Sequence, residues 1–143
     1  MKSLRLRSST AFRTVGILLC LACSAFAQEP RLANISTRAQ TGPGAAVLTA
    51  GFVIGPGANK QVLIRAIGPT LGASPFNVAG SLADPVLTVF NSAGTAIATN
   101  DDWGTAANAA AITTLGLAPT NPAESVILTT LNPGAYTAIV SGS

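Results

Sequence analysis

Glycine and proline divide most of this chain into short segments, and this punctuation limits its fold more than any other feature. The turn-forming groups include Gly42-Pro43-Gly44, Gly55-Pro56-Gly57, Gly68-Pro69, Asp84-Pro85 and Asn132-Pro133-Gly134. Proline fixes φ and glycine permits positive φ, so such groups mark turns. The segments between them are rich in Val, Ile, Leu and Thr. Short segments of this composition predict an all-β fold, an antiparallel β-sandwich that is jelly-roll-like.

Seven segments are predicted as strands: Leu32–Thr37, Ala46–Ile54, Gln61–Ile67, Val86–Phe90, Ala96–Thr99, Ser125–Leu131 and Ala135–Ser141. Val62-Leu63-Ile64 is apolar on both faces, which favours a central strand covered on each side. The Asn132-Pro133-Gly134 group predicts a type II turn and a hairpin over 125–141. Residues 55–60 are interpreted as another hairpin loop, since a phosphate loop would end in Gly-Lys-Ser/Thr. The alanine-rich stretch 105–115 predicts one short helix, closed by Gly116.

The first residues have the order of a secretory signal peptide. Residues 1–13 carry four basic and no acidic side chains, and an apolar run follows that ends in Ala25-Phe26-Ala27. This run is shorter than the roughly 20 residues of a membrane helix. We expect cleavage after Ala27, a secreted, periplasmic or cell-surface location, and no stable membrane span afterwards. Lipidation at Cys23 is a weaker reading, because Cys20 stands where a bulky aliphatic residue is expected.

Cleavage changes the charge of the chain. Residues 28–143 keep four basic and five acidic side chains, a net charge of −1, so the formal +3 of the whole chain gives no reason to expect nucleic-acid binding. Both cysteines are also removed, so no disulfide can stabilise the domain. Residues 28–143 are expected to form one domain, held by its hydrophobic core.

The composition disfavours an enzyme. The chain has no histidine, which rules out a Ser-His-Asp arrangement and histidine-ligated zinc. No cysteine remains after cleavage to act as a nucleophile. We therefore expect no catalytic residues and no cofactor, with calcium as the one ion left open.

Asn100-Asp101-Asp102-Trp103 is the strongest candidate for chemistry. Asn100, Asp101 and Asp102 could supply three of the six to eight oxygens that calcium takes. Catalysis by the two carboxylates is a further alternative, although nothing else in the sequence indicates a cleft. We favour a turn in which Asn and Asp end a strand and cap the following helix, while Trp103 packs on the sandwich edge.

Arg65 is predicted to have a structural role. It follows Val62-Leu63-Ile64 in an apolar strand, where an unpaired guanidinium would be costly to bury. Asp84, in a loop near the strand Val86–Phe90, is its expected partner, with Asp101 or Asp102 as substitutes.

Two stretches carry a resemblance to a known family. Residues 90–103 (FNSAGTAIATNDDW) and 131–140 (LNPGAYTAIV) resemble the pre-peptidase C-terminal domain. More closely, residues 31–38, 51–55, 63–71 and 82–85 are similar to an uncharacterised β-sandwich module of secreted bacterial proteins. This resemblance covers nearly all of residues 31–143. It implies an accessory domain, often attached to secreted enzymes or surface proteins, and raises the calcium option for Asp101 and Asp102.

From the residues and the resemblance together we expect a secreted, non-catalytic accessory or adhesive module. Its partners would be other domains of a larger secreted protein or a cell-surface polymer. The alternative is a calcium-dependent or carbohydrate-binding module attached to a secreted enzyme. The resemblance also predicts one more strand after Ser143, without which 135–141 would be an unpaired edge that favours oligomers.

Overall fold

The computed structural model describes residues 34–41 and 46–142. The chain divides into two compact units, Met1–Ser36 and Thr37–Ser143, and the strands described below all belong to the second. The predicted signal peptide, residues 1–27, lies outside the described residues. Residues 34–37 are exposed and not in a strand, so the strand prediction for Leu32–Thr37 is wrong where the structure describes it. Ile35 is 77% exposed, so this segment buries no side chain that would hold a strand in place.

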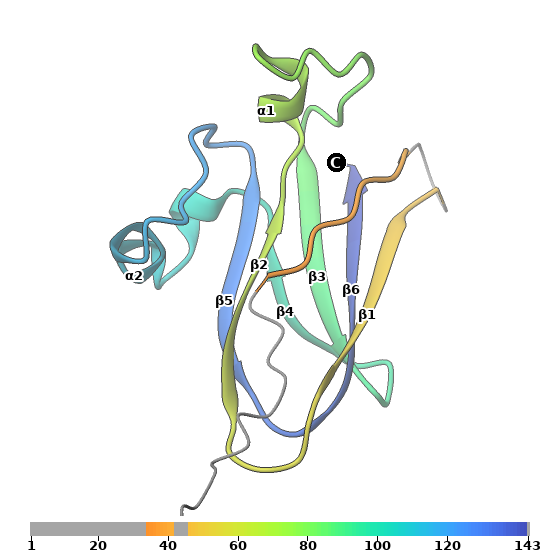
Figure 1. The fold of residues 1–143 in the computed structure, drawn as a ribbon, viewed down its shortest axis with the longest axis vertical. Coiled ribbons are helices and arrows are strands. Elements are labelled where there is room, and N and C mark those ends of the chain that lie inside the picture. Colours follow the sequence, from red (N-terminus) through yellow and green to blue (C-terminus); the bar gives the residue numbers. More distant parts are fainter. Residues whose placement is uncertain (1–33, 42–45, 143) are drawn as a thin grey trace, which may run out of the picture. The chain divides into compact units, whose positions relative to one another are not determined.

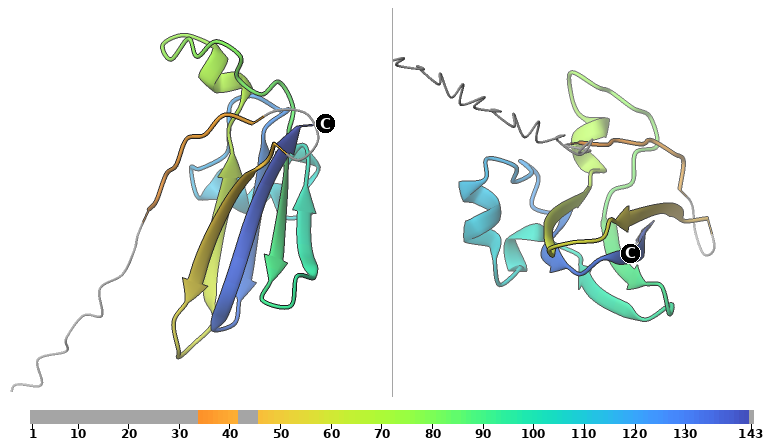
Figure 2. Two further views of the ribbon diagram at one scale, coloured as in Figure 1. Left: turned by 90° about the vertical axis from the view of Figure 1, so that its right-hand side faces the viewer. Right: turned by 60° about the horizontal axis from the view of Figure 1, so that its bottom comes forward.

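Six strands form two antiparallel sheets within the described residues (Figure 1). They are β1 (Leu48–Ile54), β2 (Lys60–Ala66), β3 (Pro85–Asn91), β4 (Ala96–Asn100), β5 (Ser125–Leu131) and β6 (Gly134–Gly142). The larger sheet has the order β1-β6-β3-β4, and the smaller one pairs β2 with β5. Figure 2 shows the strands of the larger sheet side by side. The predicted all-β, sandwich-like antiparallel fold is confirmed.

The core lies between the two sheets. Leu87 and Val89 of β3 are fully buried and meet Ile127 of β5, Ala66 of β2 and Ala138 of β6. These side chains lie on the inner faces because residues two apart on a strand point to the same side. Burying a side chain such as Leu or Val contributes about 1.5–3 kcal/mol. The described residues contain no cysteine, so no disulfide among them joins the two layers, and this apolar contact is a main source of their cohesion.

The chain passes between the sheets at two neighbouring bends. Ile54 pairs with Gly134 in the larger sheet, and Lys60 pairs with Leu131 in the smaller one. Residues 55–59 and 132–133 therefore connect sheets rather than neighbouring strands, as the two loops at the bottom of Figure 1 show. The hairpins predicted over 125–141 and at 55–60 are both wrong. The Gly and Pro residues mark where the chain bends, but they do not decide which sheet the next strand joins.

The structure has a genuine hairpin between β3 and β4. Asn91 organises its turn: the side-chain Oδ1 accepts the amide hydrogens of Ala93 and Thr95, both at 3.0 Å. Gly94 supplies a positive φ of 74°, which glycine adopts without steric cost. The register of the β3–β4 pair shifts between Val89 and Phe90, just before this turn.

Two predictions about neighbouring strands are also wrong. β2 lies at the edge of a two-stranded sheet, so Val62, Leu63 and Ile64 are half-buried rather than central. β6 lies between β1 and β3 and is paired on both sides. The prediction that 135–141 forms an unpaired edge is therefore wrong.

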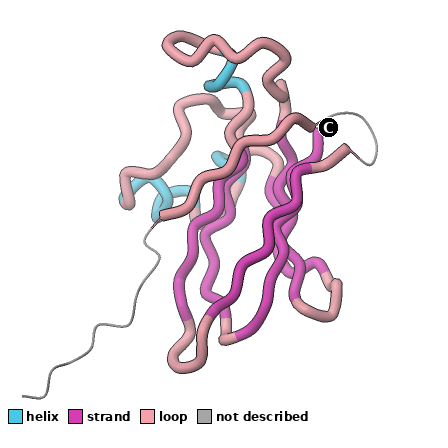
Figure 3. The backbone as a smooth tube through the Cα atoms, turned by 45° about the vertical axis from the view of Figure 1, so that its right-hand side comes forward, coloured by secondary structure: helices cyan, strands magenta, loops and turns pink. Residues whose placement is uncertain are grey.

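The helices are short and lie in the connections, as Figure 3 shows in cyan. The helix predicted near 105–115 is divided into a 3-10 turn, η1 (Trp103–Thr105), and α2 (Ala109–Thr114). Ile112 of α2 is fully buried, and Gly116 ends the helix with a φ of 67°. A further helix, α1 (Pro69–Gly72), was not predicted. None of the helices in 34–41 and 46–142 has the length and apolar character to cross a membrane.

Candidate functional site

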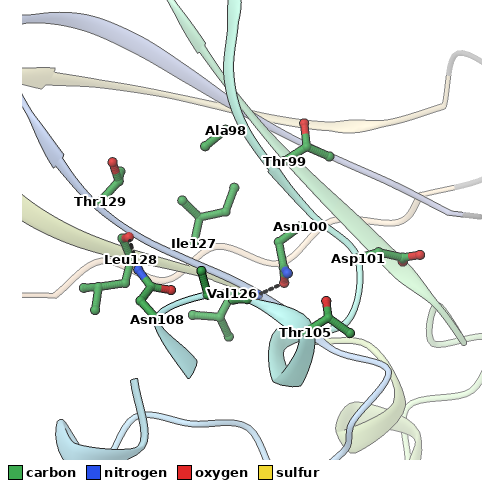
Figure 4. A pocket seen from close by; sticks show the side chains of 12 residues that line it. Ala98, Thr99, Asn100, Asp101, Thr105, Asn108, Val126, Ile127, Leu128 and Thr129 are labelled. Atoms are coloured by element: carbon green, nitrogen blue, oxygen red, sulfur yellow. Dashed lines mark hydrogen bonds between the residues drawn. The ribbon is translucent and has the colours of Figure 1, made fainter. Parts of the chain in front are cut away.

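The predicted site begins where β4 ends. The Asn100 side chain makes two hydrogen bonds: its Oδ1 accepts the amide hydrogen of Val126 at 2.8 Å, and its Nδ2 donates to the Asp102 carbonyl at 3.0 Å. The first bond crosses from the larger sheet to β5 of the smaller one (Figure 4). Asn100 therefore acts as a link between the sheets, which the turn interpretation did not predict. Its bond to Asp102 is a local contact of the kind that the turn interpretation expects.

Trp103 opens the 3-10 turn that follows. Its backbone amide donates to the Glu124 carbonyl at 2.9 Å, which fixes this turn to the residue just before β5. The indole is half-buried, and its Nε1 is a buried donor for which the described residues provide no acceptor. The predicted helix cap is wrong in detail. The Asp102 carboxylate makes no capping hydrogen bond, whereas the Asp102 carbonyl accepts from the Thr105 hydroxyl at 2.8 Å.

Three carboxylates influence one another near this turn. Partial desolvation raises the pKa of Asp101, and the negative charges of Asp84 and Asp102 raise it further. Asp101 is exposed, while Asp84 and Asp102 are half-buried. Repulsion between these carboxylates is unfavourable, and a cation would relieve it.

The calcium prediction for Asn100, Asp101 and Asp102 stays a prediction. Among the residues that the structure describes, no group of three or more Asp, Glu, His or Cys side chains is arranged to hold a metal ion. Asn100 Oδ1 is already bonded to the Val126 amide. A calcium ion that used this oxygen would have to compete with that bond.

Arg65 does not occupy the environment that its sequence context predicts. Its side chain is exposed, and its Nη1 donates to the Leu117 carbonyl at 3.1 Å. The expectation of a buried guanidinium is wrong because β2 is an edge strand and Arg65 points away from the core, opposite to Ile64 and Ala66. The bond to Leu117 instead holds the connection after α2 against β2.

Glu124 and Ser125 are structural residues that the sequence analysis missed. Glu124 is 1% exposed, and its Oε1 accepts the amide hydrogen of Thr70 at 2.8 Å, which anchors α1. Ser125 is fully buried, and its hydroxyl donates to the Pro85 carbonyl at 2.8 Å, from the smaller sheet to the larger. The one available signal was the position of Glu124 directly before an apolar strand, where an unpaired charge would be costly.

A groove of about 570 Å³ runs between β4, β5 and the connection at 105–108 (Figure 4). Its lining mixes polar side chains (Asn100, Asp101, Thr105, Asn108 and Thr129) with Ala98, Ile127 and Leu128. Asn108 Nδ2 donates to the Leu128 carbonyl at 2.7 Å, so this amide also satisfies the free edge of β5. Asp101 is the only ionisable side chain among the lining residues, so the groove offers hydrogen bonds but no acid–base pair.

The side of the larger sheet that faces away from the core forms a second surface, which we call the outer face. It carries Thr88, Phe90, Thr137 and Ile139, whose neighbours Leu87, Val89 and Ala138 point into the core. Thr99 and Thr88 meet across β4 and β3, with their hydroxyl oxygens 3.3 Å apart. The charged residues between 46 and 142 are Lys60, Arg65, Asp84, Asp101, Asp102 and Glu124, and none lies in the larger sheet.

The outer face has both projecting and recessed parts. Val53 of β1 is 73% exposed and Ile97 of β4 is 42% exposed. A shallow hollow of about 510 Å³ is lined in part by Phe90, Thr137 and Ile139 of the same face. An uncharged sheet face with exposed apolar side chains is typical of an interaction surface.

Comparison with known proteins adds no relative: no protein-family model, no curated protein and no solved structure matches this chain. The fold and its surfaces define the class as an all-β, sandwich-like protein of two antiparallel sheets.

Proposed function

We propose that this chain is a secreted, non-catalytic accessory or adhesive module that acts through the outer face. The observation that carries the proposal is the complete absence of charge from the four strands of the larger sheet. Sheets that face water on one side normally alternate apolar inward and polar outward residues. Here the outward positions are occupied by Thr, Ser, Gly, Ala, Val, Ile and Phe. These uncharged residues cost little to desolvate when another surface covers them.

The composition supports a module without catalysis. The chain has no histidine, and its cysteines lie within residues 1–27. Four of the six residues that the sequence singled out, Asn100, Asp102, Trp103 and Arg65, belong to turns or make structural hydrogen bonds. Secretion follows from the basic, apolar and small-residue order of residues 1–27. Export followed by mass measurement should give a chain that begins at Gln28.

The role of the outer face can be tested by retention on a phenyl matrix from dilute solution. Thr137→Lys places one charge at the centre of the face and should reduce retention strongly. The matched control is Thr130→Lys. Thr130 is exposed and lies on β5 of the smaller sheet, so this variant should be retained on the matrix like the unchanged chain. Equal retention of all three proteins would refute the proposal.

Carbohydrate binding is the second candidate, and the polar lining of the groove beside β5 favours it. Sugar hydroxyls would find Asp101, Thr105 and Thr129 there without a strong charge. A panel of neutral oligosaccharides should then raise the melting temperature of the unchanged chain and not of Thr129→Val. No shift with any sugar would remove this candidate.

A further inference from the structure

We infer that the outer face binds a second copy of this chain, giving a dimer in which two larger sheets pack face to face. The inference rests on the proposed function and specifies its partner. Its basis is the geometry and charge of the larger sheet, independent of the groove and of the acidic turn.

The charge distribution favours a copy of the same chain. In a two-fold symmetric dimer each patch meets itself, so any charge near the axis meets a like charge. A surface that pairs with itself must therefore be neutral or carry both signs in a matching order. The four strands of the outer face meet this condition, since none of the six charged residues between 46 and 142 lies in β1, β6, β3 or β4. Asp84 and Asp101 lie just outside it, directly before β3 and directly after β4.

The shape of the outer face, with projecting side chains beside a hollow, also suits self-association. Val53 and Ile97 project, and the hollow beside Phe90 and Ile139 lies on the same face. A surface with both features can place its projections into the hollows of a rotated copy. Thr49, Ile139, Thr88 and Thr99 form one row across the four strands. The three threonines are shorter than Ile139, so a second sheet can approach closely beside it.

The area is close to that of a specific contact. A patch four strands wide and seven residues long measures about 19 by 24 Å, or about 450 Å² if flat. Two such faces cover about 900 Å² before side-chain relief is added, close to the roughly 1,000 Å² that a specific interface needs. Packed sheets would lie about 10 Å apart, as in the sandwich itself.

The first test is light scattering and sedimentation of the exported chain from low to high micromolar concentration. We expect a monomer–dimer equilibrium that Thr137→Lys and Thr88→Lys shift to monomer, while Thr130→Lys and Thr137→Ser leave it unchanged. Because the contact has no ion pairs, added sodium chloride should not weaken it, and sulfate should strengthen it. Circular dichroism and melting curves show whether each variant is folded.

The second test traps the contact between the two copies with a disulfide. It does not require the fold to accommodate a lysine in the outer face. Residues 28–143 contain no cysteine, so Thr137→Cys introduces one thiol near the centre of the face. Mild oxidation should give a disulfide-linked dimer with Thr137→Cys and not with Thr130→Cys. The mass of the exported chain confirms that Cys20 and Cys23 are absent.

Two outcomes would overturn the inference. A monomer at every concentration would exclude the second copy, and the proposed function would still stand if phenyl retention depends on Thr137. A dimer that survives both lysine substitutions and forms no disulfide at Thr137 would show that copies meet elsewhere. The proposed function would be refuted only if Thr137→Lys were retained on the phenyl matrix as strongly as the unchanged chain.

Discussion

Asn100 holds Val126: the side-chain oxygen of the first accepts the amide hydrogen of the second at 2.8 Å. The bond joins the last residue of β4 to the second residue of β5, and these strands belong to different sheets. Val126 is 1% exposed, so its amide has little access to water. This contact gives the turn at 100–103 a defined structural purpose.

Asn100→Ala should therefore destabilise the fold by about 1–3 kcal/mol, the cost of leaving a buried donor unsatisfied. Chemical denaturation with and without the substitution measures the difference. Asn59→Ala, in the exposed loop between β1 and β2, is the matched control and should change stability little. Equal midpoints for both variants would show that the bond between the sheets contributes nothing.

Glu124→Ala should also destabilise the fold, because it removes the acceptor of the Thr70 amide and leaves a cavity around a residue that is 1% exposed. We expect a loss of about 1–3 kcal/mol. Glu124→Gln keeps a side-chain oxygen at the same place and should retain most of the stability. If the glutamine variant were as unstable as the alanine variant, the negative charge rather than the hydrogen bond would be responsible.

Asp101 should make stability depend on pH in the acid range. Its folded-state pKa lies above the ordinary value of 3.8, because of desolvation and the charges of Asp84 and Asp102. The carboxyl therefore contributes stability below pH 3.8, and this contribution is lost as pH rises through the folded pKa. Asp101→Asn should melt at a higher temperature than the unchanged chain at neutral pH and at the same temperature in strong acid.

The cause of this shift can be tested by following the Asp101 carboxyl by NMR. Of the two neighbouring charges, that of Asp84 has the larger effect on the pKa of Asp101. Asp84→Asn removes this charge and should lower the pKa. Asp102→Asn should lower it less. An unchanged pKa in both variants would leave desolvation as the sole cause.

Calcium should bind weakly at most. Free calcium at a concentration equal to its dissociation constant would stabilise the fold by only about 0.4 kcal/mol. We expect little change in melting temperature at millimolar calcium, because Asn100 Oδ1 is occupied by the Val126 amide. A rise of many degrees that is lost in Asp101→Ala would instead establish a calcium site at this turn.

The sequence predicted the position of the strands well, because local composition and turn residues determine where a strand begins and ends. The range Ser125–Leu131 was predicted without error, and the other five observed strands lie within two residues of their predicted ends. Pairing was predicted poorly, since it depends on contacts between distant segments. Asn132-Pro133-Gly134 fits a hairpin turn by its residues alone, yet Leu131 stays with Lys60 and Gly134 joins Ile54.

At the candidate site, too, the local features were predicted from the sequence and the distant contacts were not. The turn at 100–103 followed from Asn and Asp, whose side chains bond nearby backbone. The partners of Asn100, Arg65 and Glu124 lie far along the chain, at Val126, Leu117 and Thr70. Neither composition nor spacing contains that information. The outer face was missed because it becomes visible only when four strands are placed in order.

The order of pairing also sets the order in which the fold can be assembled. β1 pairs with β6, Leu48 meeting Val140, and β2 pairs with β5. Of the strand pairs, only the β3–β4 hairpin is local in sequence, so it alone can form before residues beyond 124 are available. Folds dominated by distant pairings fold slowly, because the chain must close long loops before contacts stabilise it. Neither sheet can therefore be completed during synthesis until β5 and β6 have been made.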